Sequence, residues 1–357
     1  MTTIDFHKLG HWEQCPNARD FWNKDIQTPR YAIGKNCQSL DINMISPLDG
    51  IVDDYSTSST WNNIPVVHSS QVPKNSLVVN CSTSVSPVSV EKVFSNREWC
   101  LLSLNSVIHA SEGALKLPLF SQGMWHLVEH DADKLNKIYR SLADNESKHV
   151  FLDTIAYRLY LQPSVMKNYK NRISEQYFED FMAFENDVFV DAGGFDGDTT
   201  EEFAVRYPTY KKIYLIEPSS KNMDNAKRRL KNFSRIEFIQ RAVSNKYQEL
   251  TFDEDSGSAS NVSDSGSIKV IAEPIDDLIK EKVTFLKMDL EGWEVQALEG
   301  SASIIKQDKP KLAIAVYHSS KDYISLYDYI MNINPDYKVY MRHYTEGWSE
   351  TIMFFKR

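Results

Sequence analysis

Two acidic residues stand at the ends of apolar runs in the second half of the chain, where they could bind a cofactor. Asp191 directly follows the run 188–190 and precedes a glycine-containing stretch, and Glu217 follows the run 213–216. Glycine is needed where the backbone takes a positive φ or approaches a ligand closely. We expect both acids at the carboxyl edge of an open α/β sheet, which is the edge where such sheets bind ligands.

The glycine spacing after the first acid separates two classes of cofactor. Dinucleotide sites carry G-x-G-x-x-G directly after the strand, whereas here an acid comes first and no G-x-G follows. A carboxylate at that place would repel a pyrophosphate, but it suits a cofactor with a cationic amine and no phosphate, such as S-adenosylmethionine. Glu217 could accept both ribose hydroxyls, although NAD sites also use an acid there. The residues of the first turn expected to border the cofactor are Asp191, Gly193, Gly194, Phe195, Gly197 and Thr199.

Four further residues are candidates for the chemistry. Asp289 ends a later apolar run and could act as a general base or hold the amine of the cofactor. His318 follows the next run at the same expected edge, and an imidazole titrates near neutral pH. Glu291 lies in the first turn of an expected helix, where a carboxylate also has a structural use because it complements the helix dipole. His343 ends a late strand and is expected to contact the acceptor. A divalent metal held by Asp289 and His318 stays an alternative that the ligand spacing does not indicate.

An alternation of strands and helices must position these residues. Near-continuous apolar strands are typical of a parallel sheet with helices on both faces. Strands are expected at 188–190, 213–216, 236–239, 284–288 and 311–316, with helices at 200–207, 221–230, 275–279 and 293–305. The chain closes with two expected antiparallel strands, 337–341 and 351–355. The serine- and glycine-rich segment 253–267 predicts a loop.

The first part of the chain shows a shorter alternation of the same kind. Short apolar runs bounded by turn residues predict a small parallel α/β unit. Two helices are expected between residues 121 and 170, where Pro163 ends the second. The predicted organisation is a lead-in over 1–27, a smaller Rossmann-like α/β domain over 28–115, a helical linker over 116–180 and a larger α/β domain over 181–357.

Composition excludes several classes of function. The chain has 357 residues and a formal net charge of −9, which argues against a basic nucleic-acid footprint. Its four cysteines have no Cys-x-x-Cys spacing, so neither a zinc site nor a disulfide framework is indicated. No apolar run approaches the ~20 residues of a transmembrane helix, and the N-terminus lacks the apolar region of a signal peptide. We therefore expect a cytoplasmic protein.

The second half of the chain also resembles a known family. The segment FLKMDLEGWE at 285–294 and ALEG at 297–300 are similar to motifs of the FkbM-type methyltransferases, as are KPKLAIAVYH at 309–318 and YMRHY at 340–344. The resemblance covers about residues 185–357. It implies a class I, seven-stranded Rossmann-like methyltransferase domain, S-adenosylmethionine as cofactor, and O-methylation. Because family substrates are often sugar hydroxyls, we expect a carbohydrate acceptor in a polysaccharide, a glycoside or a sugar nucleotide.

The resemblance also implies roles for single residues. Asp191 and Gly193 would border the methionine part of the cofactor, and Glu217 the ribose. Arg241 and Ala242, just past the third strand, would lie near the adenine.

The N-terminal unit is similar to the extra Rossmann-like unit of a subgroup of this family. GIVDD at 50–54 and NIPVV at 63–67 carry that likeness. The resemblance implies a packing module through which the chain could form a homo-oligomer. Docking of the acceptor or of a sugar nucleotide is the alternative role.

Two other functions remain open from the residues alone. A nicotinamide-dependent sugar oxidoreductase would use the two Rossmann-like units and Glu217, but the missing G-x-G-x-x-G and the presence of Asp191 disfavour it. A non-enzymatic scaffold with a vestigial cofactor pocket is the other alternative, and the near-complete motifs argue against it.

Overall fold

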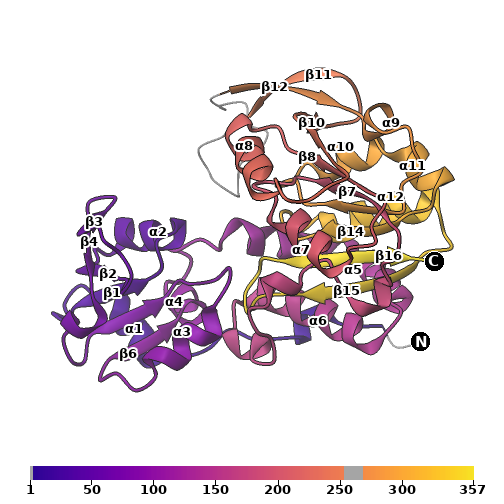
Figure 1. The fold of residues 1–357 in the computed structure, drawn as a ribbon. Coiled ribbons are helices and arrows are strands. Elements are labelled where there is room, and N and C mark those ends of the chain that lie inside the picture. The colour runs from indigo at the N-terminus through magenta and orange to yellow at the C-terminus, as the bar shows by residue number, and fades with distance from the viewer. Residues whose placement is uncertain (1–2, 253–267) are drawn as a thin grey trace. The chain divides into compact units, whose positions relative to one another are not determined.

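A computed structural model describes residues 3–252 and 268–357, and the chain divides into two compact units (Figure 1). The first unit contains the residues up to Ala132 together with His149–Asn171 and Tyr344–Ser349, and the second contains Asp133–Lys148, Arg172–His343 and Glu350–Arg357. Since each unit is built from several stretches of chain, the predicted boundaries at 28, 116 and 181 stay a prediction. The predicted loop 253–267 lies outside the described residues. None of the helices in the described parts of the chain has the length and apolar composition of a bilayer-spanning segment.

The first unit contains a six-stranded sheet. Its order is β3-β4-β2-β1-β5-β6, and all neighbours are parallel except the hairpin of β3 with β4. This arrangement confirms the predicted smaller Rossmann-like α/β unit, to which the structure adds β3. The strands are β1 (Arg30–Ile33), β2 (Gly50–Val52), β3 (Thr60–Trp61), β4 (Ile64–Val67), β5 (Leu77–Asn80) and β6 (Cys100–Ser103).

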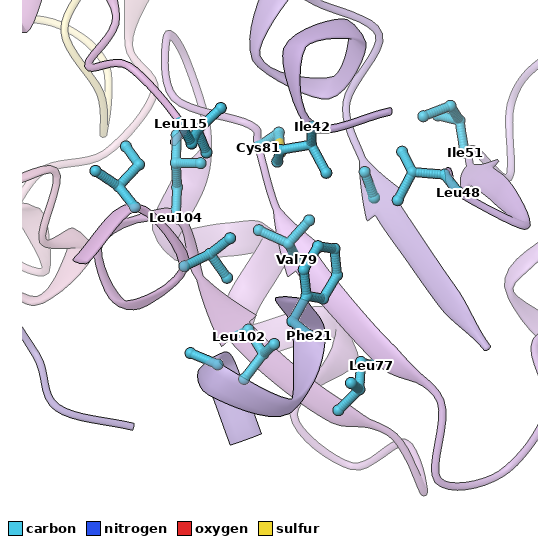
Figure 2. Packing of buried hydrophobic residues seen from close by; sticks show 14 of the residues in the cluster. Phe21, Ile42, Leu48, Ile51, Leu77, Val79, Cys81, Leu102, Leu104 and Leu115 are labelled. Carbon is cyan, nitrogen blue, oxygen red and sulfur yellow. The ribbon is translucent and has the colours of Figure 1, made fainter. Parts of the chain in front are cut away.

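Helices cover both faces of this sheet, so its strands are apolar on both sides. In β5, Leu77 and Val79 belong to one apolar cluster and Val78 to another, as the two-residue period of a strand requires. Figure 2 shows Phe21 and Ile42 packing in the first cluster with Val79. The helices and short 3₁₀ turns of this part are η1 (Phe6–Lys8), α1 (Pro16–Trp22), α2 (Cys37–Ile45), η2 (Ser69–Gln71), α3 (Pro87–Phe94) and α4 (Leu104–Ala110).

Two long helices follow, as the sequence predicts. They are α5 (Leu119–Ser141) and α6 (Asn145–Tyr160), and α5 bends at Asp131, whose φ of −127° is not helical. The 3₁₀ turn η3 (Pro163–Met166) begins at the expected proline, which cannot continue a helix. Two further 3₁₀ turns, η4 (Ile173–Glu175) and η5 (Asp180–Met182), lead to the second sheet.

The second unit contains a seven-stranded sheet in the order β15-β16-β14-β13-β7-β8-β9. Strand β16 is antiparallel to both of its neighbours, and the others run parallel to one another. The class I Rossmann-like fold and its closing hairpin are therefore confirmed. The strands are β7 (Val188–Ala192), β8 (Lys212–Ile216), β9 (Ile236–Ile239), β13 (Phe285–Met288), β14 (Lys311–Ala315), β15 (Lys338–His343) and β16 (Thr351–Lys356).

The helices of the second unit differ from the prediction at one place. The single helix expected over 293–305 is wrong, because α10 and α11 are separated at Gly300 and Ser301. A Cβ at Gly300 would lie 2.0 Å from the carbonyl oxygen of Ser244, so a close backbone contact fixes this break. The helices are α7 (Asp198–Arg206), α8 (Ser220–Arg229), α9 (Ile275–Leu278), α10 (Glu294–Glu299), α11 (Ala302–Gln307) and the additional α12 (Asp322–Ile333). The structure also contains a small sheet that the sequence did not predict. It consists of β10 (Ala242–Val243), β12 (Ile268–Glu273) and β11 (Gln248–Phe252).

Candidate functional site

A cavity of about 610 Å³ opens at the carboxyl edge of the second sheet. It is lined by residues just past the ends of three strands: Gly193 after β7, Asp289 after β13 and Tyr317 two residues after β14. Parallel strands bring such positions to one edge, where open α/β sheets bind ligands. The structure therefore places the first glycine turn and the candidates Asp289 and Glu291 around the same space.

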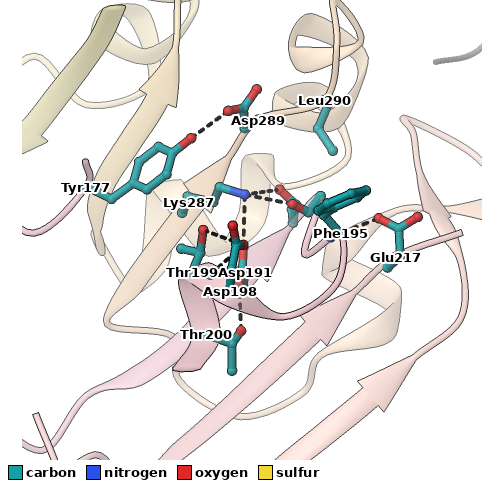
Figure 3. A network of polar contacts seen from close by, with 12 residues as sticks. Tyr177, Asp191, Phe195, Asp198, Thr199, Thr200, Glu217, Lys287, Asp289 and Leu290 are labelled. Atoms are coloured by element: carbon teal, nitrogen blue, oxygen red, sulfur yellow. Dashed lines mark hydrogen bonds and ion pairs between the residues drawn. The ribbon is translucent and has the colours of Figure 1, made fainter. Parts of the chain in front are cut away.

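A buried ion pair lies beneath the first turn. Nζ of Lys287 is 3.0 Å from Oδ1 of Asp191 (Figure 3). It also donates a hydrogen bond to the carbonyl oxygen of Gly193 at 2.7 Å. Asp191 also accepts a hydrogen bond from Thr200. Burial opposes the charge of Lys287, but the Asp191 and Asp289 carboxylates outweigh it and raise the pKa of the ammonium. Lys287 is therefore a buried cation that holds the turn in place.

Gly193 occupies a position that no other residue could take without strain. Its φ is +79°, and a Cβ there would lie 2.0 Å from the carbonyl oxygen of Asp289. A side chain at Gly194 would meet Leu215 at 2.5 Å. These two glycines thus allow the β7 turn to pack directly against the segment after β13 and against β8.

The structure brings Glu217 to the first turn. Its buried carboxylate accepts hydrogen bonds from the backbone N–H of Phe195 at 3.1 Å and of Ser219 at 3.0 Å, and from the side chain of Asn222 at 3.3 Å. Burial raises the pKa of Glu217 to about 7, and these donors lower it only in part. The acid at the end of β8 is therefore a largely desolvated hydrogen-bond acceptor beside the turn.

Asp289 is the centre of a second group of polar contacts. The hydroxyl of Tyr177 donates to its Oδ2 at 2.5 Å, and the hydroxyl of Tyr317 lies 3.3 Å from both carboxylate oxygens. Nε2 of His318 lies 3.3 Å from Oδ1. These contacts fix the orientation of the carboxylate toward the cavity.

His318 is surrounded by carboxylates. Beyond Asp289, its Nε2 lies 3.4 Å from Glu291, and its Nδ1 lies 3.0 Å from Glu294. Burial lowers the pKa of His318, but the three carboxylates together raise it to about 10. The ring is therefore protonated at neutral pH, which differs from the near-neutral titration expected from the sequence.

Two other acids on the cavity titrate near neutral pH. Burial raises the pKa of Glu291 to about 7, opposed by the positive charge of His318 and assisted by neighbouring carboxylates. Burial and the charge of Asp289 likewise raise the pKa of Glu350 to about 7, although Gln176 donates a hydrogen bond to it at 2.8 Å. Both groups can exchange a proton near physiological pH.

Backbone strain is concentrated around the cavity. Four of its lining residues are not glycine and nevertheless have positive φ: Tyr177 at 75°, Phe195 at 44°, Glu291 at 52° and Glu350 at 63°. Such conformations cost free energy, of order 1–3 kcal/mol each, and tend to persist where function requires a particular placement. The strain supports a functional role for this cavity.

The cavity carries an excess of negative charge. Six carboxylates and only two cations line it. Both cations are engaged, since Lys287 pairs with Asp191 and Arg229 pairs with Asp196 and Glu201. The electrostatic environment therefore favours a cationic ligand over a phosphate.

The structure places the remaining predicted residues as follows. Phe195 and Thr199 line the cavity, whereas Gly197 packs against α8 with a φ of +84°. Arg241 and Ala242 follow β9 outside the lining. Nε of Arg241 donates to Glu273 on the small sheet, and Ala242 pairs with Ala272 of β12.

His343 is not brought to the cavity. It is buried in β15 at the edge of the sheet, and its Nδ1 lies 2.9 Å from the hydroxyl of Thr351 on β16.

Several residues of the site are absent from the sequence prediction. The sequence does contain an indication for Lys287. A lysine interrupts an otherwise apolar buried strand, and buried charges are rare without a partner. Glu294 lies in the first turn of α10, where an acid is common because it complements the helix dipole, so its type and position do not mark it as a site residue. Tyr177 and Glu350 follow no predicted strand, so nothing in the local pattern singles them out.

Comparisons with known proteins agree with this geometry. Residues 191–344 match the family model described as the methyltransferase FkbM domain. The crystal structure of a methyltransferase FkbM from Methylobacillus flagellatus is similar to this chain with a TM-score of 0.74 and 21% identity, covering 96% of this chain and 94% of that one. That likeness shows the fold over both units. No curated protein matches the chain.

Two more distant solved structures cover only about half of the chain. A fibrillarin from Aeropyrum pernix, in complex with S-adenosyl-L-methionine, has a TM-score of 0.35 and 12% identity, covering 52% of this chain and 71% of that one. A putative methyltransferase from Streptococcus mutans, in complex with SAH, has a TM-score of 0.33 and 14% identity, covering 50% and 94%.

Proposed function

Because residues 191–344 match the methyltransferase FkbM domain, we propose that this chain is an S-adenosylmethionine-dependent O-methyltransferase acting on a carbohydrate hydroxyl. One observation carries the proposal. A single cavity combines the glycine turn after β7 with the carboxylates Asp289, Glu291 and Glu350. A cofactor site and groups able to take a proton are therefore adjacent.

The residues present fit S-adenosylmethionine. The excess of carboxylates suits its sulfonium and amine, whereas the pyrophosphate of a dinucleotide would be repelled. An ionised carboxylate offers about four lone pairs, and Glu217 receives three donors, so it retains capacity for ribose hydroxyls. We assign the methionine part to the turn at Asp191 and Gly193, and the adenine to Arg241 and Ala242. When bound, the cofactor supplies an activated methyl group.

The acceptor is expected to be a neutral molecule with several hydroxyl groups. Carboxylates accept hydrogen bonds from hydroxyls, and a sugar presents adjacent hydroxyls that can satisfy several of the six carboxylates on the cavity. The same carboxylates disfavour nucleic acid, whose phosphates need Lys and Arg. A sugar hydroxyl is scarcely ionised at neutral pH, so transfer of a methyl group to its oxygen requires a group that accepts the proton.

We assign the role of accepting this proton to Glu291 and Glu350. The pKa of each is raised to about 7, which is the range in which a general base is most effective. Tyr177 and Tyr317 orient Asp289, which can hold the acceptor hydroxyl by accepting a hydrogen bond. The protonated His318 keeps Asp289 and Glu291 close together despite their like charges.

We also propose a cytoplasmic location. The four cysteines are free thiols, and Cys37 is exposed. Exposed free thiols are typical of reducing compartments, because oxidising ones convert them to disulfides.

The proposal is tested by transfer of the labelled methyl group of S-adenosylmethionine to a panel of oligosaccharides, glycosides and sugar nucleotides. We expect at least one acceptor to be methylated, and Glu291→Gln to lower kcat by roughly 10²–10⁴-fold because a general base is lost. Glu299→Gln is the matched control, since Glu299 is exposed on α10, where it accepts a hydrogen bond from the side chain of Asn245 at 2.7 Å. Absence of transfer to every carbohydrate, together with methylation of a different class of hydroxyl, would refute the carbohydrate assignment.

A further inference from the structure

We infer that Asp289, Glu291 and His318 form a binding site for a divalent metal ion that holds the acceptor hydroxyl. The catalytic use of this site rests on the proposed function, whereas the binding of the ion does not. The three residues follow two adjacent strands, β13 and β14, and line or face the cavity described above.

The geometry of the ligand atoms carries the inference. One oxygen from each carboxylate and one nitrogen of the imidazole all lie within 4.8 Å of one another. Nε2 of His318 is 3.3 Å from Oδ1 of Asp289 and 3.4 Å from Oε2 of Glu291. Ligands in adjacent positions of an octahedral ion, each at about 2.1 Å, are about 3 Å apart. The two distances to the imidazole nitrogen therefore exceed this spacing by only a few tenths of an ångström.

His318 provides an independent indication. Its side chain is only 8% exposed, and Nε2 makes no hydrogen bond in the described structure although it faces Asp289 and Glu291. A buried nitrogen without a hydrogen bond is costly unless something else satisfies it. A metal ion at the centre of the three residues would do so, and its binding would release the proton that the carboxylates otherwise hold on the ring.

The surroundings of His318 are those of a metal ligand. Its Nδ1 lies 3.0 Å from Oε1 of Glu294, and the same oxygen accepts a hydrogen bond from the backbone N–H of Leu290 at 2.7 Å. Histidines that bind metals almost always contact a carboxylate or carbonyl through the other ring nitrogen, which fixes the ring orientation. Glu294 is therefore a positioning residue that directs Nε2 toward the ion.

The charge balance also calls for a cation. Asp289, Glu291, Glu294 and Glu350 are gathered around one imidazole, while the nearby Lys287 is paired with Asp191. A divalent ion offsets the mutual repulsion of these carboxylates. Mixed imidazole and carboxylate ligands suit first-row ions such as Mn²⁺.

The site would act on the acceptor because three protein ligands leave coordination positions open. A sugar hydroxyl in an open position would bind through its oxygen, and the ion would lower the pKa of that hydroxyl. Its O–H bond then breaks with the electron pair left on oxygen. With Glu291 occupied as a ligand, the proton would pass to Glu350, which lines the cavity and is not among the proposed ligands.

The test is a titration of Mn²⁺ into the full-length protein after removal of metals with a chelator, followed by electron paramagnetic resonance of free Mn²⁺. We expect one ion per chain at this site, with affinity at least tenfold lower in His318→Gln and in Glu291→Gln. Removal of an outer contact that supports a ligand typically costs 10–100-fold in affinity, so loss of a ligand itself should cost at least as much. Binding of S-adenosylmethionine, measured in parallel, shows whether each variant retains its fold and its cofactor site.

His126→Gln is the matched control. His126 and His130 are four residues apart on α5 with ring centroids 4.2 Å apart, so they form a surface pair where an ion could bind without relation to the site. Loss of Mn²⁺ binding in His318→Gln but not in His126→Gln supports the inference. No Mn²⁺ binding, or binding that only His126→Gln abolishes, overturns it. Mn²⁺ binding at the site without any binding of S-adenosylmethionine would instead contradict the proposed function.

Discussion

Replacing Lys287 with methionine is expected to lower the free energy of unfolding by about 3–5 kcal/mol, because it leaves the buried charge of Asp191 without its partner. Neither side chain is screened by solvent, since Lys287 is 3% exposed and Asp191 is fully buried. Methionine matches the length of lysine but cannot donate to the carbonyl oxygen of Gly193. We therefore also expect the binding of S-adenosylmethionine to be lost.

Thermal unfolding and cofactor titration of the same samples check this prediction. For a chain of 357 residues, a loss of this size corresponds to a melting temperature lower by about 4–7 °C. Lys212→Met is the matched control: Lys212 lies on the parallel strand β8 and pairs with Glu237 and Glu281, but it is 32% exposed. Such a surface pair contributes at most about 1 kcal/mol.

The double variant Asp191→Asn, Lys287→Met separates the two effects. With neither charge present, much of the stability should return, whereas cofactor binding should remain impaired because the hydrogen bond to Gly193 is still missing. An unchanged melting temperature in Lys287→Met would mean that the ion pair is not a determinant of this fold.

Gly193→Ala is expected to weaken the binding of S-adenosylmethionine by at least about tenfold, or 1.4 kcal/mol. The added Cβ would lie 2.0 Å from the carbonyl oxygen of Asp289, so the turn after β7 and the segment after β13 must move apart. The positive φ adds a cost of about 1–2 kcal/mol for any residue with a Cβ. Isothermal titration calorimetry measures the change directly.

Gly113→Ala isolates the contribution of the backbone. Gly113 has a φ of +92°, but a Cβ there would meet nothing within 4 Å. This control should be destabilised only by the conformational cost of the positive φ, and it should bind the cofactor normally. Equal affinities of the two variants for S-adenosylmethionine would show that the contact between Gly193 and Asp289 does not shape the site.

The strands of the second sheet could be predicted because they are buried on both faces. Runs such as 213–216 and 311–316 are almost uninterrupted in apolar residues, so their ends, and with them Glu217 and His318, are visible in the sequence. The helix expected over 293–305 was wrong because the break at Gly300 depends on the carbonyl of Ser244, a contact between distant parts of the chain. A local pattern contains no such information.

The environment of the candidate site was less predictable than its members. The position of His318 at the end of β14 follows from the sequence, but its pKa depends on three carboxylates that the fold brings around it. Tyr177 and Glu350 reach Asp289 and the cavity from segments outside the parallel strands. Their placement is a property of tertiary packing, which spacing along the chain does not encode.

The central claim is that the cavity at the carboxyl edge of the second sheet binds S-adenosylmethionine. Calorimetric titration of the full-length protein with S-adenosylmethionine, S-adenosylhomocysteine and NAD in parallel tests it most directly. We predict micromolar Kd values for the first two ligands, at least tenfold weaker binding in Glu217→Ala, and no measurable binding of NAD. Tight binding of NAD, with none of S-adenosylmethionine, would contradict the assignment of the cofactor and with it the proposed methyl transfer.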